Sequence, residues 1–487
     1  AYGYRDQLQD AMSLVSREPA LLAAQIRLHA QRQFPEGDVH HWWHLPGGAG
    51  VRTHFSDDLL WLPLACALYV ERTGDRALLD ERVPFLDGAA VPAGQEDIYE
   101  TPRIGDETAP IYEHAARAID HSLRVGAHGL PLFGTGDWND GMNRVGHGGR
   151  GESVWLAWFL CQVVDSMVPL ASARGDQARV ARWRAAQAGW VGALETQGWD
   201  GRWYRRGFFD DGTPLGSAAN AECRIDLIAQ AWAVLSRVGR PDRARQAMAS
   251  AEALLLDERA GVLRLLDPPL QQARPSAGYI QAYPPGVREN GGQYNHAAVW
   301  ALMAWAQLGC AGTAWTAFCL MSPAHRWQHP DQGACYALEP YVMAGDIHSQ
   351  PPGVGRGGWS WYTGSAGWLM RAAQESLLGV VVRHDGLLLQ PCLPPHWPSA
   401  LVCVRHGGRS VQVHLCGDDA AWQAALDAHP QALTAAHGER LDWAALADGA
   451  AVVVRPRLHE SAPSAASAPT TPPLPPGAAD ATESPTT

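Results

Sequence analysis

Apolar residues recur at helical spacing through most of the first 378 residues, and segments rich in Gly, Pro, Trp, His and Asp separate these runs. Residues three and four apart share one face of a helix, so the spacing predicts helices rather than strands. The predicted helices cover residues 58–72, 111–125, 177–194, 223–235, 242–255, 297–308 and 366–378, and a further helix begins at Ser153.

Short turns and long polar loops alternate between these helices. Two helices that are joined by a short turn pack as an antiparallel hairpin. A series of such hairpins predicts an α/α toroid in which the long loops gather around a cleft at one end. Because long loops in a compact domain usually carry function, we expect the functional residues in these loops.

The chain changes character after residue 379. Short β-type runs at 380–383, 387–390, 401–404 and 411–415 are separated by turns such as Asp385-Gly386, which predicts a small β-sandwich. From about residue 456 the chain is rich in Pro, Ala, Ser and Thr and is predicted to be disordered. The predicted organisation is a helical catalytic domain (1–378), a β-domain (379–455) and a tail (456–487).

The charge and aromatic composition limit the classes of molecule that the chain is expected to bind. The chain has 38 Lys and Arg against 50 Asp and Glu, a formal net charge of −12, which argues against nucleic acid as a partner. Its 21 Trp residues against 8 Phe favour carbohydrate, since indoles stack on sugar rings, although most of these indoles can equally be core residues.

The same composition predicts a compartment. None of the nine cysteines forms a CxxC pair, so buried thiols in a reducing compartment are expected. The sequence shows no signal peptide and no apolar run of about 18 residues, which predicts a cytoplasmic chain without direct membrane insertion.

The segment Gly134-Thr135-Gly136-Asp137-Trp138-Asn139-Asp140-Gly141-Met142-Asn143 carries the clearest chemistry. Gly, Asn and Asp are poor helix formers, so the segment is expected to be a loop. Cleavage of a glycosidic bond needs a proton donor at the leaving oxygen, and Asp137 and Asp140 are the candidates. The residues alone leave a site and a simple Asp-Gly turn equally plausible.

A second polar segment, 38–44, contains three imidazoles and two indoles. His and Asp are metal ligands, but the spacing matches no compact metal site, and a sugar-binding wall explains the Trp pair better. No metal is therefore predicted.

Two further segments, 289–296 and 355–366, each lead into an apolar helix. Their glycines expose backbone N–H groups, and together with His296, Thr363 and Ser365 they can surround one phosphate. The alternative is that Thr363 or Ser365 is an ordinary helix N-cap. Neither segment matches a nucleotide-binding pattern.

Six of these segments, in order, resemble glycoside hydrolase family 94: residues 4–10, 36–39, 41–44, 136–141, 289–292 and 362–368. Members include inverting phosphorylases that act on β-glucosides. The resemblance covers residues 1 to about 415 and is strongest to the phosphorylase region of cyclic β-1,2-glucan synthases and to 1,2-β-oligoglucan phosphorylases.

The resemblance implies an (α/α)6 barrel with a C-terminal β-sandwich or jelly-roll layer. It implies that Asp140 is the general acid, that phosphate is the co-substrate, and that no other cofactor is needed. It places His296, Thr363 and Gly364 at the phosphate. The implied substrate-binding residues are Arg5, Asp10, Trp138, Asp137, His41 and Trp42.

The sequence also departs from the family pattern. The N-terminal β-sandwich and helical linker of relatives are absent from it, as is an arginine that helps to hold phosphate, and His40 stands where Gln is expected. We therefore expect a module of a larger protein, fused to or associated with a membrane glycosyltransferase. The alternatives are an inverting hydrolase, with Asp57, Glu152 or Glu289 as base, and a non-catalytic carbohydrate-binding part of a glucan synthase.

Overall fold

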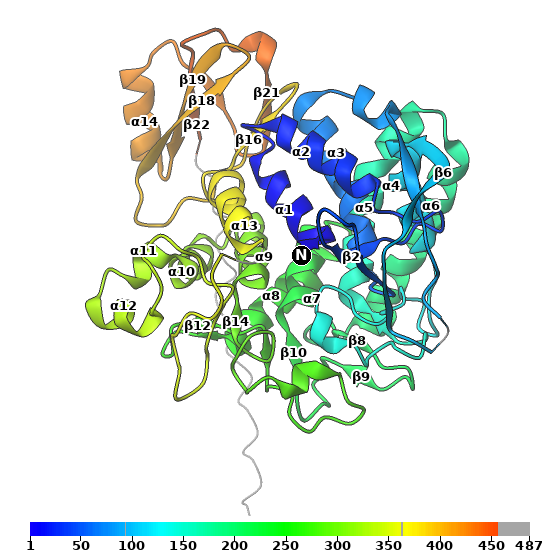
Figure 1. Ribbon diagram of the computed structural model, residues 1–487. Helices are drawn as coiled ribbons and strands as arrows, with labels where there is room; N and C mark the ends of the chain where they lie inside the picture. Colours follow the sequence, from blue (N-terminus) through cyan, green and yellow to red (C-terminus); the bar gives the residue numbers. More distant parts are fainter. Residues whose placement is uncertain (93, 362–363, 456–487) are drawn as a thin grey trace, which may run out of the picture.

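The computed structural model describes residues 1–92, 94–361 and 364–455. Six helices, here called the core helices, surround the main apolar cluster (Figure 1). Each contacts the next along the chain, and the last returns to the first. The core helices are α1 (Tyr4–Leu14), α3 (Trp61–Thr73), α5 (Val154–Ala173), α7 (Leu227–Leu235), α9 (Asn295–Leu308) and α13 (Ser365–Arg371), which continues as a π-helical segment, η6 (Ala372–Leu377).

A second set of helices packs against the first. After each of the first five core helices the chain reverses into a partner helix that contacts it. The partners are more exposed, because only one of their faces meets the core. They are α2 (Pro19–Ala30), α4 (Ile111–His121), α6 (Gln177–Ala193), α8 (Pro241–Leu255) and α10 (Ala311–Met321), and the short α11 (Pro323–Arg326) and α12 (Pro330–Tyr336) follow.

The predicted helical hairpins are therefore confirmed in outline as a mainly helical fold. Helix α3 ends at Gly74, which adopts the left-handed conformation (φ +73°) that favours glycine at a helix end. The sequence prediction missed α1, α2 and α10. Their apolar stripes are interrupted by Ala, Gly and polar residues, which weakens the periodic signal.

Small sheets lie among the loops that precede the core helices. The largest has the order β1 (Tyr2–Gly3), β2 (His40–Trp43), β3 (Gly50–Thr53), β5 (Asp97–Glu100). Segment 38–44 was predicted to be a loop, and β2 corrects this, because β1 and β3 satisfy its backbone hydrogen-bonding groups on both sides. The other strands in this region are β4 (Arg82–Asp87), β6 (Arg103–Pro110), β7 (Glu152–Ser153), β8 (Gly207–Phe208), β9 (Pro214–Leu215), β10 (Ile225–Asp226), β11 (Leu256–Asp257), β12 (Val262–Leu263), β13 (Leu266–Asp267), β14 (Gln293–Tyr294) and β15 (Asp346–Ile347).

The C-terminal region holds the strands that the sequence predicts. One sheet has the order β16 (Val380–Arg383), β17 (Gly386–Leu389), β21 (Glu439–Asp442), and the other has the order β18 (Ser399–His406), β19 (Arg409–Cys416), β22 (Ala451–Val454), β20 (Leu433–Ala435). Both sheets contribute to one apolar cluster, and α14 (Asp419–Ala428) packs against β19 and β22. The predicted tail, 456–487, lies outside the described residues.

Twelve of the 21 tryptophans are buried. Nine are fully buried, which favours the core explanation for them over sugar stacking. Helix α5 is long and apolar enough to cross a membrane, contrary to the sequence estimate, but 78% of its most apolar window is buried inside the protein. Three of the nine cysteines, Cys310, Cys335 and Cys403, are exposed rather than buried as predicted.

Candidate functional site

Most of the predicted site residues gather where the core helices begin. Helix N-termini carry unsatisfied N–H groups and a partial positive charge, so several of them together favour negative groups. The residues at or next to these N-termini are Arg5 (α1), Asp57 and Asp58 (before α3), Ser153 (α5), Asp226 (α7), His296 (α9) and Gly364 (α13).

The loop 134–143 crosses this end of the core. Gly134 has φ +68°, and a Cβ atom there would lie 1.9 Å from the carbonyl oxygen of His54, so only glycine fits. Asp137 is fully buried, and its carboxylate accepts bonds from Arg206 Nη1 (2.6 Å), Arg206 Nη2 (2.5 Å), Ser153 Oγ (2.7 Å) and the Asn139 backbone N–H (3.0 Å). The buried pair with Arg206 therefore ties the loop to the segment before β8, and Ser153 ties it to the start of α5.

Asp140, three residues further along, is placed differently. Its side chain is 32% exposed, and Oδ1 accepts a bond of 2.5 Å from Arg5 Nη2. Arg5 also donates to Asp57 (3.0 Å) and to the carbonyl oxygen of Asp137 (3.1 Å). One buried guanidinium thus holds the loop and the exposed carboxylate in register with the start of α3.

His41 approaches Asp140 from strand β2. Its Nδ1 lies 2.8 Å from Asp58 Oδ2, and its Nε2 lies 3.9 Å from Asp140 Oδ2. Burial alone would lower the pKa of His41, but the Asp58 carboxylate outweighs burial and raises it. When His41 is protonated, it supplies a second positive group beside Asp140.

Trp138 and His296 form a buried unit next to the acid loop. The indole Nε1–H donates to His296 Nδ1 at 3.3 Å. Because Nδ1 accepts, the neutral ring carries its proton on Nε2, and this atom has no hydrogen-bond partner among the described residues. Burial lowers the pKa of His296 to about 3, so the ring is neutral at pH 7. His296 thus offers one oriented, unpaired N–H donor.

The remaining predicted residues lie beside this unit. Gly364 is buried at the N-cap of α13, close to Gln9 and Asp10 of α1. Asp10 is exposed. Thr363 lies outside the described residues, so its predicted role has no structural description.

Trp42 extends from β2 outside the His41–Asp58–Asp140 group, and its ring contacts Tyr99 and His44. His40, which departs from the family pattern, is fully buried against Phe34. His40 is therefore a core residue and not part of the acid site.

The three candidate bases differ in their surroundings. Glu152 is buried and bonded to His128 and to the backbone N–H groups of His128 and Leu130, so it supports a turn. Asp57 is occupied by Arg5 and Trp61. Glu289 is different, because its Oε2 makes an ion pair with Arg288 (3.3 Å) but no hydrogen bond.

Glu289 is also electrostatically linked to the acid. Burial raises the pKa of Glu289 to about 7, and the carboxylate of Asp140 adds to this effect. Sequence reasoning gave Glu289 no role in the preferred mechanism, although its position in the Glu-Asn-Gly-Gly segment was a usable signal. Within the described residues, no group of three or more His, Cys, Asp or Glu side chains is arranged to hold a metal ion.

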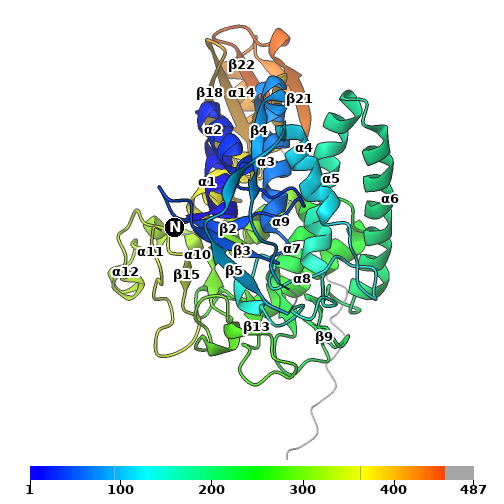
Figure 2. The same ribbon diagram turned by 45° about the vertical axis from the view of Figure 1, so that its right-hand side comes forward.

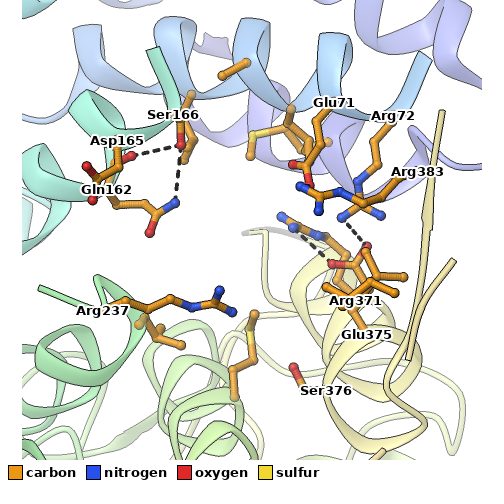
Figure 3. Close-up of a pocket in the computed structure, with 18 of the residues that line it drawn as sticks. Glu71, Arg72, Gln162, Asp165, Ser166, Arg237, Arg371, Glu375, Ser376 and Arg383 are labelled. Carbon is orange, nitrogen blue, oxygen red and sulfur yellow. Dashed lines mark hydrogen bonds and ion pairs between the residues drawn. The ribbon is translucent and has the colours of Figure 1, made fainter. Parts of the chain in front are cut away.

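A cavity of about 690 Å³, shown in Figure 3, is lined by residues from the C-terminal halves of the core helices, at the end opposite the candidate site. Arg72, Arg371 and Glu375 point together on one side of it, and Gln162, Asp165 and Ser166 lie on the other. The cavity contains none of the predicted site residues. Between the two ends stands a cluster of buried indoles, in which Trp300 contacts Trp138 on the site side and Trp232 and Trp368 on the cavity side.

Comparison with known proteins gives this arrangement a context. The family model described as "Glycosyl hydrolase 94 superfamily, catalytic domain" matches residues 1–379. The cyclic beta-(1,2)-glucan synthase NdvB of Rhizobium meliloti (strain 1021) is 48% identical over 439 residues, which are 90% of this chain and 16% of that protein.

Two phosphorylases of Paenibacillus borealis are more distant relatives. Solabiose phosphorylase is 31% identical (81% of this chain, 48% of that protein), and 3-O-beta-D-glucopyranosyl-beta-D-glucuronide phosphorylase is 30% identical (84% and 51%). The chain therefore spans about half of these relatives and a smaller share of the synthase.

Among solved structures, a GH78 family rhamnosidase of Bacillus sp. GL1 superimposes with a TM-score of 0.53 at 14% identity (86% of this chain, 38% of that one). At this identity the likeness concerns the fold alone.

Proposed function

The chain belongs to the Glycosyl hydrolase 94 superfamily, and on this premise we propose that it is an inverting phosphorylase module that cleaves β-glucosidic linkages with inorganic phosphate. One observation carries the proposal. The loop that presents Asp140 also presents Trp138, which orients the unpaired Nε2–H of His296. The proposed proton donor, Asp140, and the proposed hydrogen-bond donor to the anion, His296, are thereby coupled through one short segment.

In the proposed reaction Asp140 donates its proton to the glycosidic oxygen as the bond to the anomeric carbon breaks. A phosphate oxygen attacks that carbon from the opposite face, so the product is α-glucose 1-phosphate. Phosphate is already anionic and needs no general base.

We assign phosphate binding to His296 and the backbone of Gly364, together with Thr363, which enters by family resemblance. A neutral imidazole that donates from Nε2 binds an anion without itself titrating. His296 is 4% exposed, so the bond would form in a largely dry environment, where it is stronger than in water.

The proposed sugar contacts at the cleaved linkage are Arg5, Asp10, Trp138 and His41, and Trp42 is proposed to contact a sugar unit further along the substrate chain. Asp137 has a positioning role in the proposed site. Both of its carboxylate oxygens already accept hydrogen bonds from Arg206, Ser153 and Asn139, so neither is free to contact a sugar. Arg5 combines the proposed sugar contact with a positioning role, since it donates hydrogen bonds to the Asp140 carboxylate and to the backbone carbonyl of Asp137.

The proposal includes the finer fold. The closed order of contacts among the core helices supports an (α/α)6 barrel. We propose that the barrel spans 1–378 and the β-domain spans 379–455. The relation to the cyclic glucan synthase, of which the match covers 16%, supports a β-1,2-glucan substrate and a module within a larger protein. We also propose that this module is cytoplasmic and joined to a membrane glycosyltransferase.

The test is release of glucose 1-phosphate from β-1,2-oligoglucosides by the full-length protein. We expect release only when phosphate is present, and ³¹P NMR should identify the α anomer. Glucose release at the same rate with and without phosphate would overturn the proposal.

A second candidate, an inverting hydrolase on the same site, is favoured by Glu289. A buried carboxyl group with a pKa of about 7 suits a general base that activates water. If this candidate holds, Glu289→Gln abolishes glucose release. If phosphorolysis holds, the variant still releases glucose 1-phosphate, because attack by phosphate needs no general base.

A further inference from the structure

An aromatic surface lies on the sheet β1–β2–β3–β5, beside the acid site but separate from it. The rings of Trp42 and Tyr99 have centroids 5.8 Å apart, and His44 lies 5.2 Å from Trp42 on the other side. Strands β2, β3 and β5 lie side by side (Figure 2). Trp42 and Tyr99 both pair with Val51 of the intervening strand, so they share one face of the sheet. We call His44, Trp42 and Tyr99 the aromatic platform.

The platform is exposed in a way that the core does not explain. Tyr99 is 59% exposed, Trp42 is partly exposed and His44 is exposed. The neighbouring Trp43 is fully buried against Tyr4 and His29. Successive residues of a strand point to opposite faces, so Trp43 serves the core and Trp42 is left at the surface. Exposed adjacent aromatic rings usually mark a binding surface.

The platform is continuous with the candidate site through two strands. Strand β2 has a register shift between His40 and Trp42, where His41 has no partner on β3, so the alternation of faces is broken at His41. His41, next to Trp42, reaches Asp140. On β5, Tyr99 lies two residues after Asp97, about 7 Å along the strand. Glu96, immediately before β5, bonds Asn143 of the acid loop (2.8 Å) and accepts from Thr135 (3.4 Å). A glucan chain that extends from Asp140 along β2 and β5 therefore meets the platform.

From this placement we propose that the aromatic platform binds glucosyl units of a β-glucan chain that lie outside the cleaved linkage. This inference rests on the proposed function for its ligand class. The rings offer apolar faces for pyranose rings, and the Tyr99 hydroxyl and the His44 imidazole offer hydrogen bonds to sugar hydroxyl groups. The platform makes the module prefer long oligosaccharides to short ones.

The test compares chain lengths in the full-length protein. The variants are Tyr99→Ala and Trp42→Ala. The matched control is Trp422→Ala, which removes a partly exposed indole from α14 of the C-terminal region. For each protein, kcat/KM for phosphorolysis is measured with a β-1,2-linked disaccharide or trisaccharide and with a long linear oligosaccharide.

We expect Tyr99→Ala to lower the long-to-short ratio of kcat/KM about 10-fold, mainly through KM, since an aromatic contact contributes roughly 1–1.5 kcal/mol. The Trp42→Ala variant should lower the same ratio, and the Trp422→Ala control should leave it unchanged. Equal losses for short and long substrates, or no loss, would overturn the inference.

Binding of the long oligosaccharide without phosphate, followed by calorimetry, separates this inference from the proposed function. If wild-type protein binds the chain and Tyr99→Ala weakens binding, the platform is supported even when no glucose 1-phosphate forms. If both proteins bind equally, the platform is not a glucan site, whatever the reaction.

Discussion

The two ends of the core helices carry side chains of opposite charge, because all six helices run in the same direction between them. All six helices begin at the candidate site and run toward the 690 Å³ cavity. The beginning carries carboxylates, including Asp57, Asp58 and Asp226, and the far end carries arginines, including Arg72 and Arg371 in last turns. This distribution follows the helix dipole, which favours negative groups at N-termini and positive groups at C-termini.

The difference shows that charge alone does not identify an anion site. At the far end Arg72 and Arg371 form ion pairs with Glu375, and Arg383 forms one with Glu71. Arg371 Nη1 has no hydrogen-bond partner among the described residues, so a free donor exists at this end too, but its positive charge is already balanced by a carboxylate. At the site, the unpaired Nε2–H of His296 belongs to a neutral ring. An anion adds a hydrogen bond at His296, whereas at Arg72, Arg371 and Arg383 it competes with Glu375 and Glu71.

The largest expected effect is at the site end. Asp140→Asn should lower kcat for phosphorolysis about 10³-fold, because a general acid typically contributes 10²–10⁴. KM should change little, and steady-state kinetics with near-native circular dichroism will show it. Near wild-type kcat would remove Asp140 from the reaction.

The second-largest effect is expected at the buried ion pair between Asp137 and Arg206, near Asp140. Arg206→Met leaves Asp137 buried without its main partner, which should lower the free energy of unfolding by about 3 kcal/mol. It should also lower activity, because Asp137 holds the loop that carries Asp140. Denaturant unfolding and kinetics measured on the same variant check both, and a stable variant with full activity would refute the positioning role.

The pH dependence of the free energy of unfolding tests whether His296 is buried and neutral. Its folded pKa of about 3 lies below the unfolded value, so the unfolded state binds the proton more tightly and stability falls as pH drops below about 6.5. At pH 5 this destabilisation amounts to about 2 kcal/mol. His296→Gln should therefore give a shallower loss of unfolding free energy between pH 7 and pH 5. Parallel curves for the two proteins would contradict a buried neutral His296.

The smallest effect is expected at the cavity end. Arg72→Met removes the 3.0 Å ion pair to Glu375, but Arg371 still pairs with that carboxylate. The free energy of unfolding should fall by about 1.5 kcal/mol, while kcat/KM for phosphorolysis stays within about twofold. A large loss of activity in this folded variant would mean that the two ends are coupled through the indole cluster.

Sequence reasoning predicted the helical class, the C-terminal strands and the identity of the main loop, because apolar spacing and glycine-rich segments are local signals. It could not find the Asp137–Arg206 pair, whose members are 69 residues apart in the chain. It also missed strand β2, since aromatic and histidine residues in a short polar segment resemble a loop until partner strands are known. The contact between Trp42 and Tyr99 likewise depends on strand register.

The most direct test of the central claim is a crystal structure of the full-length protein with phosphate and a β-glucan oligosaccharide. We predict an anion within hydrogen-bonding distance of His296 Nε2 and Gly364, on the opposite side of the sugar from Asp140. An anion bound only among Arg72, Arg371 and Arg383 at the far end would contradict the claim that the loop end is the phosphorolytic site.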